Sequence, residues 1–200
     1  FYPEKREFFL ENAQLFRFRG AGGEMPFFSR RIGMSDGEAV PIDVGARLSG
    51  KVGDNDVGFL SVKTAGVEAK NIDEGRHTVL RLKHKLRGRS YVGGIFTDTH
   101  QGELDSRTYG LDGQWFFNNY LSFSGNVISV DEENIGDENM AVTGNLDYTS
   151  DPFGFGIVYN KIGKNFDPEM GYVRRKGFEK NRLQLRRSVR TVGYPIRRFS

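Results

Sequence analysis

The sequence lacks cysteine, has only three histidines and contains no long apolar run. Without cysteine there is no disulfide framework, no thiolate metal site and no cysteine nucleophile. His77, His84 and His100 form neither an HxH nor an HExxH pair, so we predict no metal site of the zinc type. No stretch approaches the roughly 18 consecutive apolar residues that a membrane helix needs, which excludes a transmembrane helix. A transmembrane β-barrel is not excluded, because its strands alternate and only one face meets lipid.

Aromatic residues and glycine are both abundant. Aromatics make up 13% of the 200 residues, and 26 residues are glycine. Aromatic side chains pack well on pleated surfaces and glycine serves turns and bulges, so this pairing indicates many short strands joined by turns. A chain of this length is enough for one domain with a sizeable core.

Apolar residues recur at every second position from about residue 40 onward. In the stretch IDVGARLSGK, Val44 and Leu48 fall on one face of a strand, while Arg47 and Lys51 fall on the other. The same alternation recurs in TVLRLKHKL, RTYGLDGQWF, MAVTGNLDY and RLQLRRSV. We count roughly eleven such segments of about 8 to 12 residues, close to the length of about 9 to 11 residues that a membrane-spanning strand needs.

Short and long connections alternate along the chain. Tight turns are expected at residues 53–56, 87–89, 118–119 and 150–152, and longer polar loops at residues 65–75, 99–105, 131–138 and 163–171. Successive connections of a meander lie at opposite ends of the sheet, so one end has short turns and the other long loops, as in outer-membrane barrels. The predicted fold class is therefore all-β, an antiparallel up-and-down meander that forms part of a transmembrane β-barrel. A soluble sandwich or lipocalin-type barrel fits the alternation as well and stays open.

Five stretches, in this order, resemble one known family: FYPEKREFFLEN, FFSRRIG, VPIDVGARLSGKVG, HTVLRLKHKLRGRSYVGGIFT and NFDPEMGYVRR. The family is an uncharacterised β-barrel domain of unknown function in outer-membrane proteins of Gram-negative bacteria, typically downstream of a family 9-like carbohydrate-binding domain. The resemblance covers nearly the whole chain and implies an internal piece of a larger barrel protein in the bacterial outer membrane. It implies no activity that can be carried over residue by residue, and a link to carbohydrate is only an association with the neighbouring domain.

A search for catalytic or ligand-binding motifs finds none, so we predict neither an enzyme nor a cofactor. The glycine-rich RGAGGEM lacks GxGxxG spacing and is interpreted as a flexible connector. The loop DEENIGDEN lacks EF-hand spacing and is interpreted as a solvated acidic loop rather than a Ca²⁺ site. The cations of RRSVRTVGYPIRRF are spread over both faces of a strand, so no nucleic-acid partner is predicted.

Basic residues on the polar face of the strands are the one feature with functional content. If that face lines a lumen, its charge would favour anionic solutes by electrostatic focusing. The alternative, which stays open, is that these cations pair with inward-facing acids at Asp43, Asp98, Asp112 and Asp147. The candidate lumen-facing cations are Arg47, Lys51, Lys63, Arg81, Lys83, Lys85, Arg182 and Arg186.

The first residues differ from the rest of the chain. Residues 1–24 are predicted to be an N-terminal junction or plug segment, and residues 25–200 the strands of an incomplete barrel, beginning with FFSRRIG. Phe9, Ala13 and Phe16 recur at helical spacing after Pro3, which favours a short amphipathic helix at the barrel mouth or in the lumen. A first strand over QLFRFR is the alternative.

Together these features favour a fragment of an outer-membrane β-barrel protein that contacts outer-membrane lipid. Its expected role is transport or surface binding, with an anionic solute or a carbohydrate as partner. The alternative is a soluble β-domain for carbohydrate binding or glycoside processing.

Overall fold

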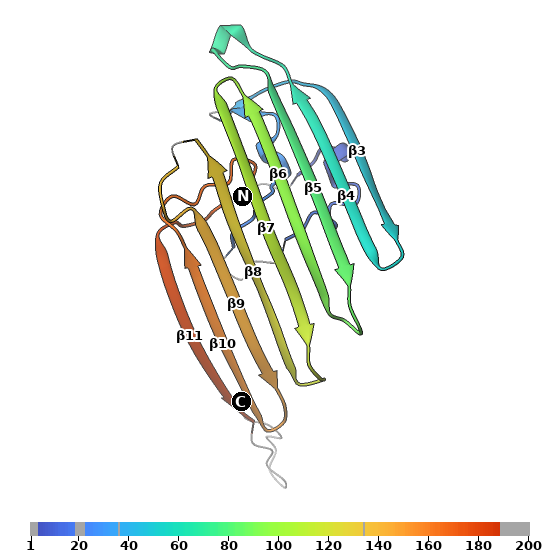
Figure 1. Ribbon diagram of the computed structural model, residues 1–200, viewed down its shortest axis with the longest axis vertical. Helices are drawn as coiled ribbons and strands as arrows, with labels where there is room; N and C mark the ends of the chain where they lie inside the picture. Colours follow the sequence, from blue (N-terminus) through green and yellow to red (C-terminus); the bar gives the residue numbers. More distant parts are fainter. Residues whose placement is uncertain (1–3, 19–22, 36, 134, 189–200) are drawn as a thin grey trace, which may run out of the picture.

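The protein is built on one antiparallel sheet of nine strands, seen in a computed structural model that describes residues 4–18, 23–35, 37–133 and 135–188 (Figure 1). Each strand pairs with its neighbours in the sequence, so the sheet is an up-and-down meander. The all-β meander predicted from the alternation is confirmed. The strands are β3 (Ile42–Val52), β4 (Asn55–Thr64), β5 (Gly75–Lys85), β6 (Tyr91–Gln101), β7 (Leu104–Phe116), β8 (Leu121–Glu132), β9 (Met140–Thr149), β10 (Phe153–Ile162) and β11 (Phe178–Arg187).

The remaining elements are short. A hairpin joins β1 (Met34–Ser35) to β2 (Glu38–Ala39), and the helical turns are α1 (Glu7–Leu10), η1 (Ser29–Arg31) and η2 (Glu68–Lys70). None of the helices in the described part of the chain is long and apolar enough to cross a membrane.

The connections divide the sheet into a short-turn end and a long-loop end. Residues 53–54, 86–90, 117–120 and 150–152 connect strands at the short-turn end, and residues 65–74, 133–139 and 163–177 at the other. The loop expected at residues 99–105 is wrong, because β6 and β7 stay paired as far as Gln101 and Leu104 and only Gly102 and Glu103 form the turn. Gly102 has φ of +58°, a conformation that glycine adopts without strain and that permits this tight connection.

The stretch FFSRRIG is not a strand. Residues Ser29–Arg31 form the turn η1, and Ile32 behind it is fully buried. The expected strand at this position is wrong, because the segment packs through its apolar side chains against a sheet that begins only at Ile42. The four-residue helix α1, in contrast, lies where an amphipathic helix was expected.

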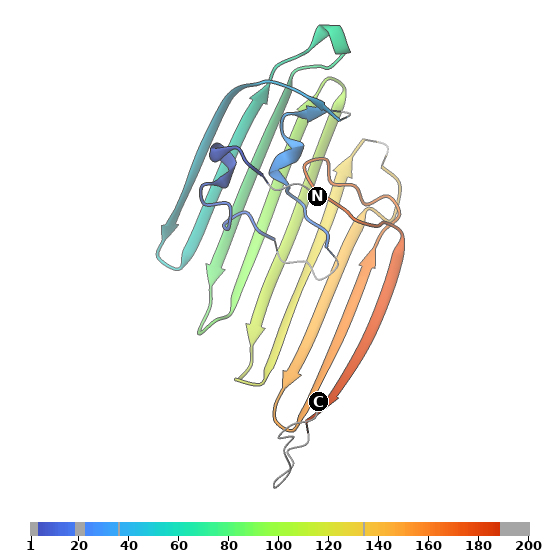
Figure 2. The same ribbon diagram turned by 180° about the vertical axis from the view of Figure 1, so that it is seen from behind.

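The two faces of the sheet have different surroundings. One face, here the covered face, lies beneath residues 4–18, 23–41 and 163–177, which cross it as shown from behind in Figure 2. The other, here the apolar face, carries no chain segment in either view (Figures 1 and 2). In the described part of the chain, the core therefore lies between the covered face and these overlying segments.

Two clusters make up this core. The first joins Phe9, Phe16 and Ile32 of the N-terminal segment (residues 4–18 and 23–33) to Leu60 and Val79 of the sheet. The second joins Ile128, Ala141 and Ile162 of the sheet to Phe166 of the loop before β11. Bridge pairing between Met25 and Tyr172 links the two overlying segments, so they form one layer over the sheet.

Candidate functional site

The apolar face presents large hydrophobic side chains to the surroundings. Leu48, Leu111 and Leu185 are exposed by 69%, 66% and 76%, respectively. In register across the middle of the sheet, Leu111 of β7 faces Gly94 of β6 and Val127 of β8. Exposed members of this face are Val44, Leu48, Leu80, Leu82, Val92, Tyr109, Leu111, Trp115, Phe123, Val127, Ile157, Leu183 and Leu185. Soluble monomers rarely expose contiguous apolar patches larger than a few hundred Å², which makes this face a candidate contact surface.

Aromatic residues border the aliphatic middle of this face. Toward the long-loop end, the rings of Phe96 and Tyr109 are 5.3 Å apart. Toward the short-turn end, Tyr148 stacks on Phe155 at 5.4 Å, and Trp115 faces Phe123 across the ladder. Aromatic rows at both margins of an apolar band are typical of the membrane–water interfaces of transmembrane proteins.

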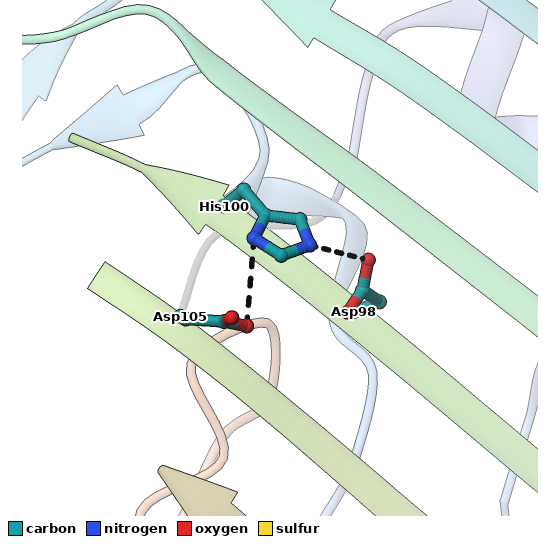
Figure 3. Close-up of side chains that lie close together, drawn as sticks. All are labelled: Asp98, His100 and Asp105. Atoms are coloured by element: carbon teal, nitrogen blue, oxygen red, sulfur yellow. Dashed lines mark ion pairs between the residues drawn. The ribbon is translucent and has the colours of Figure 1, made fainter. Parts of the chain in front are cut away.

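Beyond the Phe96–Tyr109 row, the apolar face ends in a charge network (Figure 3). His100 Nε2 lies 3.1 Å from Asp98 Oδ2, and His100 Nδ1 lies 3.4 Å from Asp105 Oδ1. Arg107 contacts both carboxylates, at 3.2 Å each. One imidazole and two carboxylates are donors that suit a divalent cation. Here, however, the two imidazole nitrogens face different carboxylates and Arg107 already contacts both carboxylates, so the arrangement favours an ion-pair network.

Two residues predicted to face the lumen lie on the apolar face instead. Asp98 belongs to the network just described, because it shares the parity of Phe96 and Val92. Lys63 pairs in register with Arg76 and forms an ion pair with Glu74 at 2.8 Å, while its neighbours Val62 and Thr64 are buried toward the covered face. Both residues lie near the long-loop end, where polar side chains occupy both faces and alternation no longer separates the two.

On the covered face, the N-terminal segment packs into positions where strands carry glycine. A Cβ added to Gly45 would lie 2.9 Å from the Phe8 ring, and one added to Gly58 would lie 2.8 Å from Leu15. A Cβ on Gly110 would lie 3.0 Å from Phe18. These distances are shorter than van der Waals contact, so the absent side chains are what allow the segment to approach the sheet.

A buried ion pair lies under this segment. Arg81 Nη1 and Nη2 donate to the two carboxylate oxygens of Asp112 at 2.7 and 2.9 Å, and Arg81 is only 1% exposed. The Tyr91 hydroxyl donates to the same carboxylate at 3.2 Å, and the guanidinium lies 5.3 Å from the Phe18 ring. Arg81 was predicted to face the lumen, and pairing of such cations with inward acids was left open. It points to the covered face, and its charge is matched by Asp112, one of the predicted inward acids.

Glu24 is a buried acid that sequence reasoning missed. It is 1% exposed, and its Oε1 accepts hydrogen bonds from Thr143 Oγ1 at 2.6 Å and from Asn126 Nδ2 at 3.3 Å. These bonds tie the end of the N-terminal segment to β8 and β9. Its position in GGEM after a glycine-rich stretch indicated a connector, and no sequence signal distinguishes a lone buried acid from a solvated one.

A second anchor lies at the start of the described chain. Arg6 donates to the backbone oxygens of Ile32 and Ser29 at 2.7 and 2.8 Å and pairs with Glu4 at 2.8 Å. Burial raises the pKa of Glu4, but hydrogen bonds from Arg6 and from the Ser29 hydroxyl more than offset this and lower the pKa to about 2. Glu4 is therefore ionised throughout the physiological range and, with Arg6, links the start of the described chain to Ser29 and Ile32.

The other predicted cations differ in whether they form ion pairs, hydrogen bonds or ring contacts. Arg47 donates to the Phe8 oxygen at 2.6 Å and pairs with Glu11, so it holds the N-terminal segment. Lys85 lies 3.8 Å from Asp56, and Lys83 stacks on the Tyr91 ring at 3.9 Å. Of the predicted cations on the covered face, Lys51, Arg182 and Arg186 remain exposed without an ion pair among the described residues. The structure thus gathers most of the predicted cations on the covered face and leaves Lys51, Arg182 and Arg186 among them exposed.

Comparisons with known protein families, with curated proteins and with solved structures found no match. The resemblance to the outer-membrane barrel domain therefore stays a prediction.

Proposed function

We propose that this chain forms part of the wall of a bacterial outer-membrane β-barrel, with its apolar face toward lipid and its covered face toward the lumen. The observation that carries the proposal is the exposed apolar face itself, bordered by aromatic residues and ended by the Asp98–His100–Asp105–Arg107 network. The aromatic residues are Phe96 and Tyr109 on one side and Trp115, Phe123, Tyr148 and Phe155 toward the short-turn end. A lipid-facing barrel surface has this order of apolar band, aromatic girdle and polar margin.

The dimensions of the sheet support the same proposal. The strands of the sheet are 10 to 13 residues long, and a tilted strand needs about 9 to 11 to cross the hydrocarbon core. One end of the sheet has only short turns, while the other has the longer loops, as in barrels that point their loops away from the cell.

The role we propose for the protein is transport or surface binding of solute. On the covered face the N-terminal segment packs beside Gly58 and holds Arg47, while the cations Lys51, Arg182 and Arg186 stay exposed. A positive wall in a confined lumen attracts anions, so the proposed solute is an anionic one, with acidic carbohydrates included.

The test compares arginine on the two faces of one strand. Leu111→Arg places a charge in the middle of the apolar face, and Gln114→Arg places the same charge on the covered face of the same strand. In a membrane barrel, Leu111→Arg should destabilise the protein folded in lipid bilayers by about 2 to 4 kcal/mol, and Gln114→Arg should change its stability little. Urea titration in bilayers measures both.

Equal tolerance of the two substitutions would overturn the proposal. So would a chain that stays monomeric in buffer without detergent, since a soluble β-domain has no need of lipid to cover Leu111. In that case Leu111→Arg should leave folding nearly unchanged.

A further inference from the structure

A row of polar side chains crosses the covered face beneath the overlying segments. Four residues, one from each of β7 to β10, pair in register from strand to strand, and each is at most 4% exposed. In this order they are Asp112, Asn126, Thr143 and Asn160. Polar atoms at this depth normally have partners, so the contacts of the row show which group lacks one.

Two buried acids meet at this row, and they differ in how their charge is balanced. Asp112 binds the guanidinium of Arg81 through both of its carboxylate oxygens. Glu24 contacts the row from the N-terminal segment, is 1% exposed and forms no ion pair among the described residues. Its Oε1 accepts from Thr143 and Asn126, whereas its Oε2 is buried and has no hydrogen-bond partner in the described part of the chain. A buried ionised carboxylate is strongly unfavourable without a counter-charge.

The backbone beside Glu24 holds the carboxylate on the row. Gly23 before it has φ of +85°, a left-handed conformation that suits glycine. Met25 after it donates its N–H to Tyr172 O at 2.9 Å and accepts from Tyr172 N at 2.8 Å. These two bonds join the two overlying segments next to Glu24. The side chain is therefore fixed against the sheet and does not reach solvent.

The oxygen atoms beside Glu24 suit a cation. The Thr143 hydroxyl has a single proton, and its contact of 2.6 Å with Glu24 Oε1 uses that proton. Asn160 Oδ1 lies 3.3 Å from the same hydroxyl oxygen, so it receives no proton from Thr143 in this arrangement. Carboxylate, hydroxyl and amide oxygens from three side chains thus lie together, with lone pairs to share. Oxygen ligands of these kinds bind hard cations.

The charge of this group indicates a monovalent cation. Glu24 supplies its single negative charge, because Asp112 is already paired with Arg81. A monovalent cation would make the buried site neutral, whereas a divalent cation would leave an excess positive charge in it. Lys180, which follows Asn160 in the row, is exposed and forms no ion pair among the described residues, so it does not supply the counter-charge.

We propose that Glu24, Thr143 and Asn160 bind one monovalent alkali cation, with Na⁺ as the probe. The cation joins the N-terminal segment to β9 and β10. Because the site is complete only when Glu24 lies on the sheet, binding stabilises the attachment of the segment. The site is independent of the proposed function, since it lies between the overlying segments and the sheet and requires neither lipid nor solute.

The amides of Met25 and Phe28 report on this attachment, because they donate to Tyr172 O and Met170 O. Residues 1–200 are refolded in a non-ionic detergent, which keeps either a barrel wall or a soluble β-domain in solution. Amide hydrogen exchange is measured at about 1 and about 100 mM NaCl, with choline chloride keeping the ionic strength constant.

We expect sodium to slow the exchange of both amides. For a site half-filled at about 10 mM Na⁺, exchange should be about tenfold slower at the higher concentration. Glu24→Gln should abolish this response, and Glu7→Gln, which changes an exposed carboxylate of α1, should keep it. No response in wild type, or an equal response in Glu24→Gln, would overturn the site.

A second variant tests the charge of the site. Asn160→Asp adds a carboxylate without changing the size of the side chain, so its exchange should respond to about 1 mM CaCl₂, which should leave wild type unchanged. A wild-type response to CaCl₂ as large as that to NaCl would overturn the monovalent assignment. Failure of Asn160→Asp to respond to CaCl₂ would overturn Asn160 as a ligand.

Discussion

At the scale of single residues, polar groups of the covered face matter more for attaching the N-terminal segment than for charging a wall. Arg81 and Asp112 are both buried, and such a pair needs hydrogen bonds to offset the cost of desolvation. Asp112 accepts from Arg81 and from Tyr91, and the Phe18 ring covers the guanidinium, while Arg81 Nε has no hydrogen-bond partner among the described residues. Alternation predicted the face on which Arg81 lies, but not that Phe18 would bury it.

Glu4 gives a prediction about pH at this scale. Its pKa is about 2 in the folded chain and 4.5 without these partners, so the folded state favours the ionised form. The stability that it contributes is complete above pH 4.5 and is lost as the pH falls toward 2. We expect the free energy of unfolding of wild type to exceed that of Glu4→Gln at pH 7 by an amount on the order of 1 kcal/mol, discounted for solvent screening. This difference should vanish near pH 2.

Urea unfolding across this pH range measures the difference between the two proteins. Glu7→Gln is the control, because Glu7 is an exposed carboxylate in the adjacent helix α1. An advantage of wild type over Glu4→Gln that does not change with pH would contradict the assignment of Glu4 as the titrating anchor.

At the scale of elements, glycine positions in the strands decide where the N-terminal segment can lie. Gly45, Gly58 and Gly110 belong to three different strands, yet all three lie under apolar side chains of residues 8–18. A glycine inside a strand weakens it slightly, since it packs no side chain. Here that space is filled by another element, so the strands and the segment are complementary surfaces.

Valine at Gly58 should displace the N-terminal segment. Its Cβ would lie 2.8 Å from Leu15 and 2.9 Å from Phe16, and such overpacking costs about 1 to 3 kcal/mol. We expect amide hydrogen exchange in residues 9–17 to accelerate in Gly58→Val. Gly50→Val on neighbouring β3 meets no atom within 4 Å and should leave that exchange unchanged. Equal exchange in the two variants would show that Gly58 does not seat the segment.

At the scale of the whole molecule, the single tryptophan reports the surroundings of the apolar face. Trp115 lies on that face toward the short-turn end and is 49% exposed. If the face meets lipid, phospholipids brominated on their acyl chains should quench most of its fluorescence, and those brominated near the headgroup should quench best. The soluble alternative instead predicts quenching by aqueous acrylamide.

A relocated tryptophan provides the control for this measurement. The double variant Trp115→Phe/Gln114→Trp moves the indole to the covered face with a shift of one residue. Its fluorescence should be much less sensitive to brominated lipid. Similar quenching at both positions would mean that the two faces do not differ in their exposure to lipid.

The sequence by itself determined the strands, their order and the faces of most side chains, since a period of two records which side of each strand is polar. It also predicted that residues near Phe9 and Phe16 form a separate apolar segment. It failed for FFSRRIG, Lys63 and Asp98, because alternation loses its meaning outside the ladder and at strand ends.

Only the tertiary structure decided which polar residues are buried and what covers the sheet. The contacts of Arg81 with Asp112 and of Glu24 with Thr143 join positions far apart in the chain, and local periodicity carries no information about them. The parallel direction of β3 and β11 also emerges only when all the pairings are counted together. Local pattern thus determines what each strand presents, while long-range packing determines which of these surfaces stay free to meet lipid, solute or another strand.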